Sequence, residues 1–323
     1  MNKTVFMSAY AKVQASDEFK RKAVELLKSK NQQKKHLRLK TVIPIAASLA
    51  VIIGVLTVYS VFQKTTNPIP NVSSTIINTD GSITIPKIKL PNGSDQMASM
   101  IPLVVYKGRI YTTSVTRIGL DDAKKLIGDK LGTAKGNLDE WSKQDDYAVE
   151  LASDISGDVY SVKGYDSNFR IMIVSKSSDG TESAGFLDCL NGITVSSGKD
   201  VLGKLNVKGD AVSLTYVQWY DGQTPIYTVD DESLMNRFID ALNNTTPCIY
   251  DQDQIQGVDL NVYDSTNIRY IIIALKDGST VQLKLVKGGY IFYGNTVFKM
   301  TNNVFNELWD KLDYSKDPST KKN

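Results

Sequence analysis

Histidine and cysteine are nearly absent from this chain of 323 residues. The single histidine is His36, and the two cysteines are Cys189 and Cys248. A Ser-His-Asp or Cys-His site needs an imidazole beside the nucleophile, and the common zinc sites need His or several Cys ligands. No histidine follows residue 36, and no P-loop or GxGxxG motif occurs. We therefore expect neither an enzyme nor a bound cofactor or metal.

Charged residues are missing from one stretch, residues 41–63, which reads TVIPIAASLAVIIGVLTVYSVFQ. A helix rises about 1.5 Å per residue, so about 20 apolar residues cross the hydrocarbon of a bilayer. The run is longer than the apolar core of a signal peptide, and no small-x-small cleavage site follows Leu56. We predict an uncleaved transmembrane helix, a signal-anchor, over residues 41–63.

Basic residues are concentrated before this run. Residues 1–40 contain 11 Lys or Arg and 3 acidic residues, which gives a net charge of 11 − 3 = +8. The whole chain carries +3, so residues 41–323 carry 3 − 8 = −5. Cationic flanks stay in the cytoplasm, which predicts a cytoplasmic N-terminus and an extracellular C-terminal region at the cell membrane. The negative outer region has no basic patch, so we expect no nucleic-acid partner.

An amphipathic helix is predicted within the basic tail. Its apolar residues recur at the spacing of one helical face; they are Phe19, Ala23, Leu26 and Leu27. A tail of 40 residues cannot build its own core, so this face needs something to cover it. Three interpretations stay open: a solvated basic anchor, a helix that binds a cytoplasmic protein in a groove, or a helix that lies on the anionic lipid of the bilayer.

The amino-acid composition of the region beyond the apolar run changes near residue 101. Residues 64–100 hold four prolines, many Ser, Thr and Asn residues and no aromatic residue, which predicts an extended linker with at most a short strand at 82–88. From there on, β-rich segments alternate with turn residues and a few amphipathic helices. This pattern predicts an α+β fold of antiparallel strands with covering helices. We favour two outer domains, 101–208 and 209–315, followed by a polar tail at 316–323.

Periodicity and turn residues place the elements of this region. Strands are predicted at 101–106, 109–114, 147–153, 157–164, 169–175, 186–190, 192–196, 211–220, 225–229, 258–263, 269–275, 280–286, 290–293 and 296–300. Helices are predicted at 120–131, 199–205, 232–243 and 304–312. The pairs Lys107-Gly108 and Asp277-Gly278 are typical of hairpin turns.

Clustered acids are the remaining chemical candidates in the outer region. They are Asp121-Asp122, Asp145-Asp146, Asp230-Asp231-Glu232 and Asp251-Gln252-Asp253. Adjacent acids on a strand point to opposite faces, and acids at a helix start serve the dipole or the cap. We therefore expect solvated or capping acids, with Asp230 or Asp231 capping the helix at 232–243, rather than a catalytic pair.

Two features of the outer region leave alternatives open. A disulfide between Cys189 and Cys248 would close a separation of 248 − 189 = 59 residues and stabilise the fold by about 4 kcal/mol; the alternative is two separate small buried residues. The aromatic residues either form an exposed surface for a glycan or peptide of the cell envelope, or belong to an ordinary core and sheet face. They include Trp219, Tyr220, Tyr263, Tyr290, Phe292 and Tyr293.

The order of these parts resembles the single-pass membrane proteins that Firmicutes encode beside extracytoplasmic-function sigma factors. The resemblance rests on SDEFKRKAVELL, on KKHLRLK followed by TVIPIAASLAVIIGV, and on IPLVVYKGRIYT and GDVYSVKGYDSNFRI in the outer region. It implies an anti-sigma factor whose tail helix binds a sigma factor and whose outer domain senses an envelope signal. The zinc-type motif His-x₃-Cys-x₂-Cys is missing from the tail, so the resemblance is to the zinc-free kind. The alternative is an anchored extracytoplasmic binding or structural module without a cytoplasmic partner.

Overall fold

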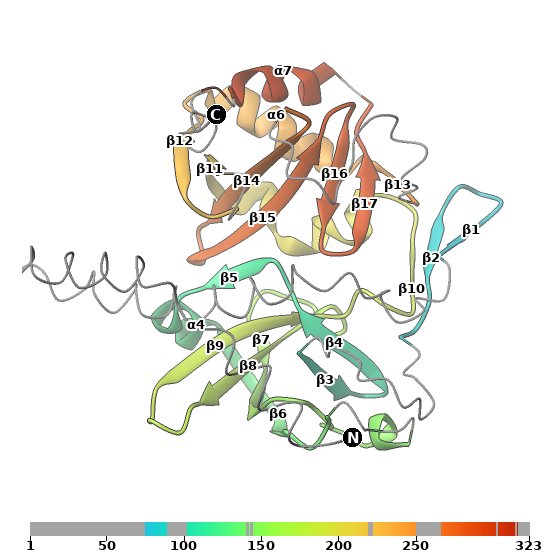
Figure 1. The fold of residues 1–323 in the computed structure, drawn as a ribbon, viewed down its shortest axis with the longest axis vertical. Coiled ribbons are helices and arrows are strands. Elements are labelled where there is room, and N and C mark those ends of the chain that lie inside the picture. Colours follow the sequence, from blue (N-terminus) through green and yellow to red (C-terminus); the bar gives the residue numbers. More distant parts are fainter. Residues whose placement is uncertain are drawn as a thin grey trace, which may run out of the picture. The chain divides into compact units, whose positions relative to one another are not determined.

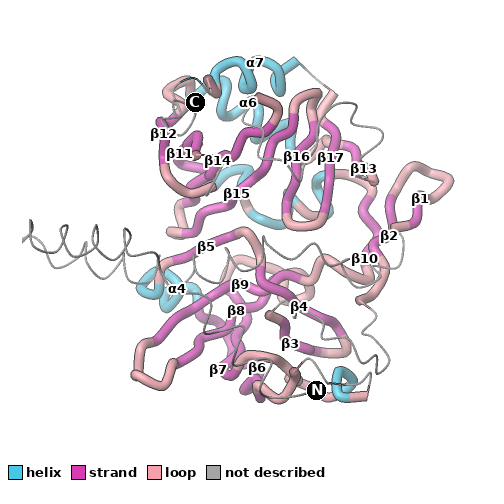
Figure 2. The backbone as a smooth tube through the Cα atoms, viewed as in Figure 1, coloured by secondary structure: helices cyan, strands magenta, loops and turns pink. Residues whose placement is uncertain are grey.

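The computed structural model describes residues 75–88, 102–139, 142, 145–218, 222–249, 266–301, 303–313 and 315. All of them belong to one compact unit, Pro68–Asn323. Its fold is α+β, with mostly antiparallel sheets and few helices, as predicted (Figure 1). Strands far outnumber helices along the described backbone, as the magenta segments of Figure 2 show.

The first sheet has six strands in the order β3-β4-β9-β8-β7-β6. Their bounds are β3 Leu103–Tyr106, β4 Arg109–Thr113, β6 Ile127–Lys135, β7 Ser156–Val162, β8 Arg170–Lys176 and β9 Glu182–Asp188. The β3–β4 turn has positive φ at Lys107 and Gly108, which is the type I′ geometry that suits a two-residue hairpin. Helix α4, Leu120–Leu126, packs on one face of this sheet through the buried Ala123.

The second sheet has eight strands, seven of them in the order β12-β11-β14-β15-β16-β17-β13. Their bounds are β11 Ala211–Val217, β12 Pro225–Thr228, β13 Thr246–Cys248, β14 Ile268–Leu275, β15 Ser279–Val286, β16 Tyr290–Tyr293 and β17 Thr296–Lys299. The eighth strand, β5 Thr116–Ile118, pairs with the first residues of β15, while β16 pairs with the last ones. Since β5 follows β4 of the first sheet directly, the chain crosses between the two sheets there.

Helices α6, Glu232–Leu242, and α7, Asn303–Lys311, cover the second sheet. Both bury an apolar face in the largest hydrophobic cluster of the described residues. Three short helical segments precede β11 in the chain. They are two 3₁₀ helices, η2 Gly198–Asp200 and η3 Leu202–Leu205, and the short α5 Val207–Asp210. Val201, Leu202 and Leu205 are buried in the same cluster. Residues on both sides of the predicted boundary at 208/209 therefore share one core.

A small third sheet has the order β1-β2-β10. It joins β1 Ile76–Ile77 and β2 Ile83–Ile85, which form a hairpin, to β10 Ile193–Val195. Ile83 is buried in the large cluster with α6 and α7. This part of the stretch expected to be an extended linker is therefore a packed hairpin, and β2 lies within the predicted short strand at 82–88.

The predicted helix 120–131 is wrong beyond Leu126, because residues 127–135 form β6. Ile127 pairs with Val162 of β7, and a Cβ at Gly128 would lie 2.4 Å from the hydroxyl oxygen of Ser161. Pairing with β7 therefore prevails over the helical period of the sequence, and a glycine permits the close approach.

The predicted strand 147–153 is also wrong. Residues 146–148 form a 3₁₀ helix, η1 Asp146–Ala148, whose Tyr147 packs beside Leu103 and Val105. Leu151 has φ of +60°, and its N–H donates to the carbonyl oxygen of Val105. The predicted helix 199–205 is likewise two 3₁₀ segments, because Val201 has non-helical backbone angles.

Candidate functional site

The predicted partner-binding face of the tail, formed by Phe19, Ala23, Leu26 and Leu27, lies outside the described residues. So does the uncharged run at 41–63. Among the residues that the structure describes, no helix is both long enough and apolar enough to cross a membrane. The anchor and the tail helix stay predictions.

Both cysteines are free thiols, so the disulfide left open by the sequence is not formed in this structure. Cys189 lies in a cluster of the six-stranded sheet, and Cys248 packs against a cluster of the eight-stranded sheet. Burial raises the pKa of the Cys189 thiol and raises the pKa of Cys248 to about 11. Because the thiolate is the nucleophile, neither cysteine is activated at neutral pH.

The clustered acids cap helices and pair with lysines. Asp231 is the N-cap of α6, and its carboxylate accepts a hydrogen bond from the N–H of Leu234 at 2.9 Å, which confirms the predicted cap. Asp122 in the first turn of α4 pairs with Lys125. Within the described ranges, no three His, Cys, Asp or Glu side chains converge as a metal site would require. Asp251 and Asp253 lie outside those ranges.

A buried ion pair is the most unusual chemical feature of the described fold. Arg170, the first residue of β8, meets Asp188, the last residue of β9, and both side chains are fully buried. The guanidinium donates twice, from Nε to Oδ1 at 2.8 Å and from Nη2 to Oδ2 at 2.9 Å. Such a two-point geometry is the strongest form of an Arg–carboxylate pair.

Two residues of the eight-stranded sheet complete this polar cluster. The hydroxyl of Tyr293, on β16, donates to Oδ2 of Asp188 at 2.6 Å and accepts from Nη2 of Arg170 at 3.0 Å. Thr116, on β5, lies 2.9 Å from both the Tyr293 hydroxyl and Nη2 of Arg170. We call these four residues, Arg170, Asp188, Tyr293 and Thr116, the buried polar cluster. It joins the two large sheets by hydrogen bonds.

Aromatic rings surround the guanidinium. The carbon Cζ of Arg170 lies 4.5 Å from the ring centre of Phe186, 4.9 Å from that of Tyr165 and 5.8 Å from that of Phe169. Desolvated cation–π contacts of this kind contribute about 2 kcal/mol each. The Tyr165 hydroxyl in turn donates to Asp277, in the β14–β15 turn, at 2.7 Å. This contact is a second polar link between the sheets.

The electrostatic surroundings of the cluster shift the pKa values of its buried groups. Burial lowers the pKa of Arg170, but the charges of Asp188, Tyr293 and Tyr165 and the hydrogen bond to Asp188 together raise it by more, so the guanidinium stays protonated. Burial, followed by the charge of Asp188, raises the pKa of Tyr293, and burial raises the pKa of Tyr165 to about 12. The Arg170 guanidinium and the Tyr293 hydroxyl therefore keep their protons at neutral pH. The arrangement can hold the two sheets together through an ion pair and hydrogen bonds.

The sequence analysis missed the buried polar cluster. Arg170 was predicted only as part of the strand 169–175, and Tyr293 only as one of the outer aromatics. The signal was present: Arg170 stands between Phe169 and a run of four apolar residues, IMIV. A charge inside an apolar strand needs a buried partner, but the sequence does not show which acid supplies it.

The outer aromatics are core residues where the structure describes them. Tyr293 is fully buried, Phe292 is nearly so, and Tyr290 packs against the same cluster as Phe292. Beside them, Nζ of Lys284 lies 4.3 Å from the ring centre of Phe292, and burial lowers the pKa of this lysine. Trp219, Tyr220 and Tyr263 lie outside the described residues.

An open hollow of about 350 Å³ lies at the N-terminal end of α6. Its lining mixes the start of β11, the end of β12 and the first turn of the helix; the residues are Ala211, Val212, Ser213, Thr228, Val229, Asp230, Glu232, Met235 and Asn236. Besides the exposed acids Asp230 and Glu232, its polar side chains are those of Ser213, Thr228 and Asn236, and the rest of the lining is apolar.

No protein-family model matches the chain, and no curated protein or solved structure is significantly similar to it.

Proposed function

We propose that this chain is a single-pass membrane-anchored regulator. Its outer region binds or senses a signal of the cell envelope, and its cytoplasmic helix binds a partner protein such as a sigma factor. The uncharged run at 41–63, with a +8 tail on one side and −5 on the other, carries this proposal. A span of this length fits a bilayer, and the charge difference orients it.

The fold of the outer region supports a binding role better than a catalytic one. Its most elaborate polar arrangement, the buried polar cluster, is closed to solvent, and its Arg170 and Tyr293 side chains do not titrate near neutral pH. Its two thiols have raised pKa values. A sensor domain needs a rigid body that presents a surface, and two sheets joined by hydrogen bonds meet that need.

Membrane fractionation tests the anchor. We expect the full chain to stay in the membrane pellet after extraction at alkaline pH. Protease added to cells without their wall should remove the C-terminal region and spare a tag at the N-terminus. A chain recovered in the soluble fraction, or a tag digested from outside, would contradict the proposed topology.

A pull-down tests the tail. The double variant Phe19→Asp with Leu26→Asp places two acids on the apolar face and should lose the cytoplasmic partner. The matched control, Arg21→Gln with Lys28→Gln, lowers the net charge by the same two units on the opposite face, and it should keep the partner. If the first variant retains every partner, the docking role of the helix is wrong.

The second candidate function is an anchored extracytoplasmic module whose tail only fixes it to the bilayer. The same observations of the outer fold favour it, because none of them requires a cytoplasmic partner. Exchange of residues 1–35 for an unrelated basic sequence separates the two functions. The module keeps its activity after this exchange, whereas the regulator loses it.

A further inference from the structure

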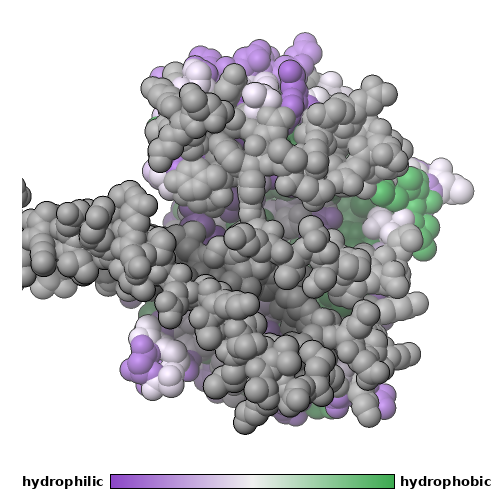
Figure 3. All heavy atoms as spheres, viewed as in Figure 1, coloured by the Kyte–Doolittle hydropathy of each residue, from purple (hydrophilic) through white to green (hydrophobic). Residues whose placement is uncertain are grey.

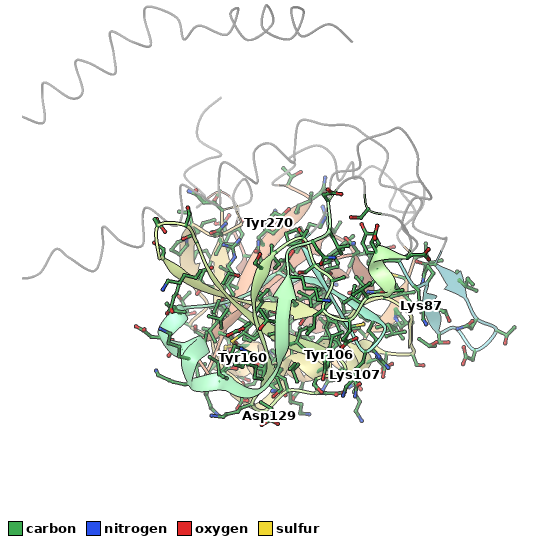
Figure 4. The ribbon with its side chains drawn as sticks, turned by 90° about the horizontal axis from the view of Figure 1, so that it is seen from below. Lys87, Tyr106, Lys107, Asp129, Tyr160 and Tyr270 are labelled. Atoms are coloured by element: carbon green, nitrogen blue, oxygen red, sulfur yellow. The ribbon has the colours of Figure 1, made fainter. Side chains whose placement is uncertain are left out.

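The β1–β2 hairpin exposes large apolar side chains. Ile76 and Ile77, which make up β1, are 57% and 65% exposed, although Ile83 on the neighbouring strand is 4% exposed. Figure 3 shows hydrophobic surface gathered on this hairpin, at the right of the view. In Figure 4 the hairpin projects from the side of the folded unit, next to Lys87. Exposed apolar side chains grouped in this way mark an interaction surface.

The edge strand β1 lacks the protection that four other edge strands, β12, β13, β6 and β3, have. Strand β12 begins with Pro225, and β13 holds Pro247 at its centre. Strand β6 is interrupted by two register shifts, and β3 is covered because Val105 exchanges hydrogen bonds with Leu151 and Ala152. Prolines, bulges and covering segments are the usual means of preventing edge-to-edge pairing. Strand β1 has only two isoleucines, so its edge is open to another strand.

The register of the hairpin shows which backbone groups face outward. The N–H of Asn78 donates to the carbonyl of Ser82, and the next pair along the ladder is Ile77 opposite Ile83. Hydrogen-bonded and non-hydrogen-bonded pairs alternate in an antiparallel ladder. The N–H and C=O of Ile77 therefore point away from β2. Two copies of β1 related by a two-fold axis at Ile77 satisfy each other's groups and bring the two Ile77 side chains together on one face, with the Ile76 side chains on the opposite face.

The chemistry of the hairpin favours a second copy over a lipid surface. Its tip carries Asp80, whose carboxylate accepts hydrogen bonds from the N–H and the hydroxyl of Ser82. These hydrogen bonds lower the pKa of Asp80, so the tip is charged and unsuited to entering a bilayer. The isoleucines lie behind the tip, at the strand edge, where a partner strand reaches them.

The position of β1 in the chain favours pairing between anchored copies. Eleven residues, 64–74, separate the predicted span from Thr75. Fully extended they reach about 40 Å, so hairpins of neighbouring copies in one membrane lie at similar heights. Confinement of this kind raises the effective concentration of one hairpin around another, which compensates for a short contact.

We propose that β1 is a homodimer contact, in which two copies of the chain pair antiparallel through Ile77 and its symmetry mate. The inference rests on the proposed membrane anchor for its effective concentration. The occupant of the exposed edge is a second copy of this chain.

Cysteine cross-linking of the full chain in membranes tests the register. In the proposed pairing, two Ile77→Cys residues face each other with Cα atoms about 5.5 Å apart, within the reach of a disulfide. Thr75→Cys, directly before β1, is the matched control. Residue 75 faces residue 79 of the partner, so two such cysteines are about 14 Å apart and cannot bond.

We expect mild oxidation to convert Ile77→Cys into a dimer at about ten times the yield of Thr75→Cys and of the exposed control Val212→Cys. Equal yields at 75 and 77, no dimer at 77, or a product of another mass would each overturn the proposal. Membrane fractionation of the same samples separates its failure from that of the anchor. A chain found in the membrane without the cross-link refutes the dimer, and a chain missing from the membrane refutes the anchor.

Discussion

The eight-stranded and six-stranded sheets bury their side chains in different ways. The first packs two amphipathic helices and the 3₁₀ segments onto one face and places most of its buried side chains in one large apolar cluster, beside one small cluster. The second divides its buried residues among three smaller clusters, and its Arg170–Asp188 pair is completed by residues of the other sheet. The eight-stranded sheet is therefore stabilised mainly by burial of apolar side chains, whereas the six-stranded sheet also has a buried polar contact with its neighbour.

Loss of Arg170 should have the largest effect on stability. Arg170→Met leaves the Asp188 carboxylate buried without its counter-charge, which should lower the free energy of unfolding by about 3–5 kcal/mol. The double variant Arg170→Met with Asp188→Leu should recover most of this loss, because no unpaired charge remains. Chemical denaturation of the three proteins measures both effects. A double variant less stable than the single one would contradict the reasoning.

A cavity in the apolar cluster should have the next largest effect. Leu283→Ala, at a fully buried position of β15, should lower the free energy of unfolding by about 2–5 kcal/mol. Val212→Ala, at an exposed position of β11, is the control and should change it by less than about 0.5 kcal/mol. If the two sheets unfold together, fluorescence and far-ultraviolet circular dichroism give one midpoint for the Leu283 variant. Separate midpoints would show that the polar contact does not couple the sheets.

Removal of the Tyr293 hydroxyl measures how much its hydrogen bonds between the two sheets contribute to stability. Tyr293→Phe deletes the donor to Asp188 and the acceptor for Arg170 while keeping the ring, which should cost about 1–3 kcal/mol. The matched control Tyr160→Phe removes a hydroxyl from the six-stranded sheet that is bonded only to Asp158 at 3.3 Å, and it should cost much less. Thermal unfolding of both variants tests this difference. Equal losses would mean that the hydroxyl of Tyr293 contributes nothing specific.

Deletion of the N-cap of α6 tests how much this helix contributes to the stability of the eight-stranded sheet. Asp231→Ala removes the acceptor of the Leu234 N–H at the start of α6, which should cost about 1 kcal/mol. Asp231→Asn keeps a capping oxygen and should recover most of the stability. If Asn and Ala destabilise equally, the cap hydrogen bond is not the cause.

The smallest expected effect is a pH dependence at Lys284. Burial lowers its pKa below the ordinary 10.5, so the folded state binds fewer protons than the unfolded state between the two pKa values. Stability from this residue therefore rises with pH toward 10.5. Lys284→Met should be more stable than the parent at neutral pH, and the difference should shrink as the pH approaches 10.5.

Local sequence signals predicted much of this fold. The hairpin of β14 and β15 was expected because Asp277-Gly278 joins two alternating runs, and the structure has Gly278 at φ +84° with Asp277 accepting from the N–H of Ser279. The bounds of β16, residues 290–293, and the N-cap of α6 followed from equally local patterns. These elements are right because neighbouring residues alone decide them.

Contacts distant in sequence account for what the sequence did not predict. Residues 127–131 have a helical period, yet their pairing with β7 makes them a strand. Arg170 and Asp188 are 18 residues apart, and Tyr293 is a further 105 away. No local pattern states that these three side chains meet, because the meeting depends on how the two sheets dock.

The crossing strand β5 has a consequence for how such a protein can be divided or recombined. Only residues 114 and 115 separate β4 in one sheet from β5 in the other, and Val201, Leu202 and Leu205 fill the core beneath α6. A gene fragment that begins at residue 209 would lack a strand and part of its interior. A cut between residues 208 and 209 would therefore separate β5 from the sheet it pairs with and would divide the core that packs against α6.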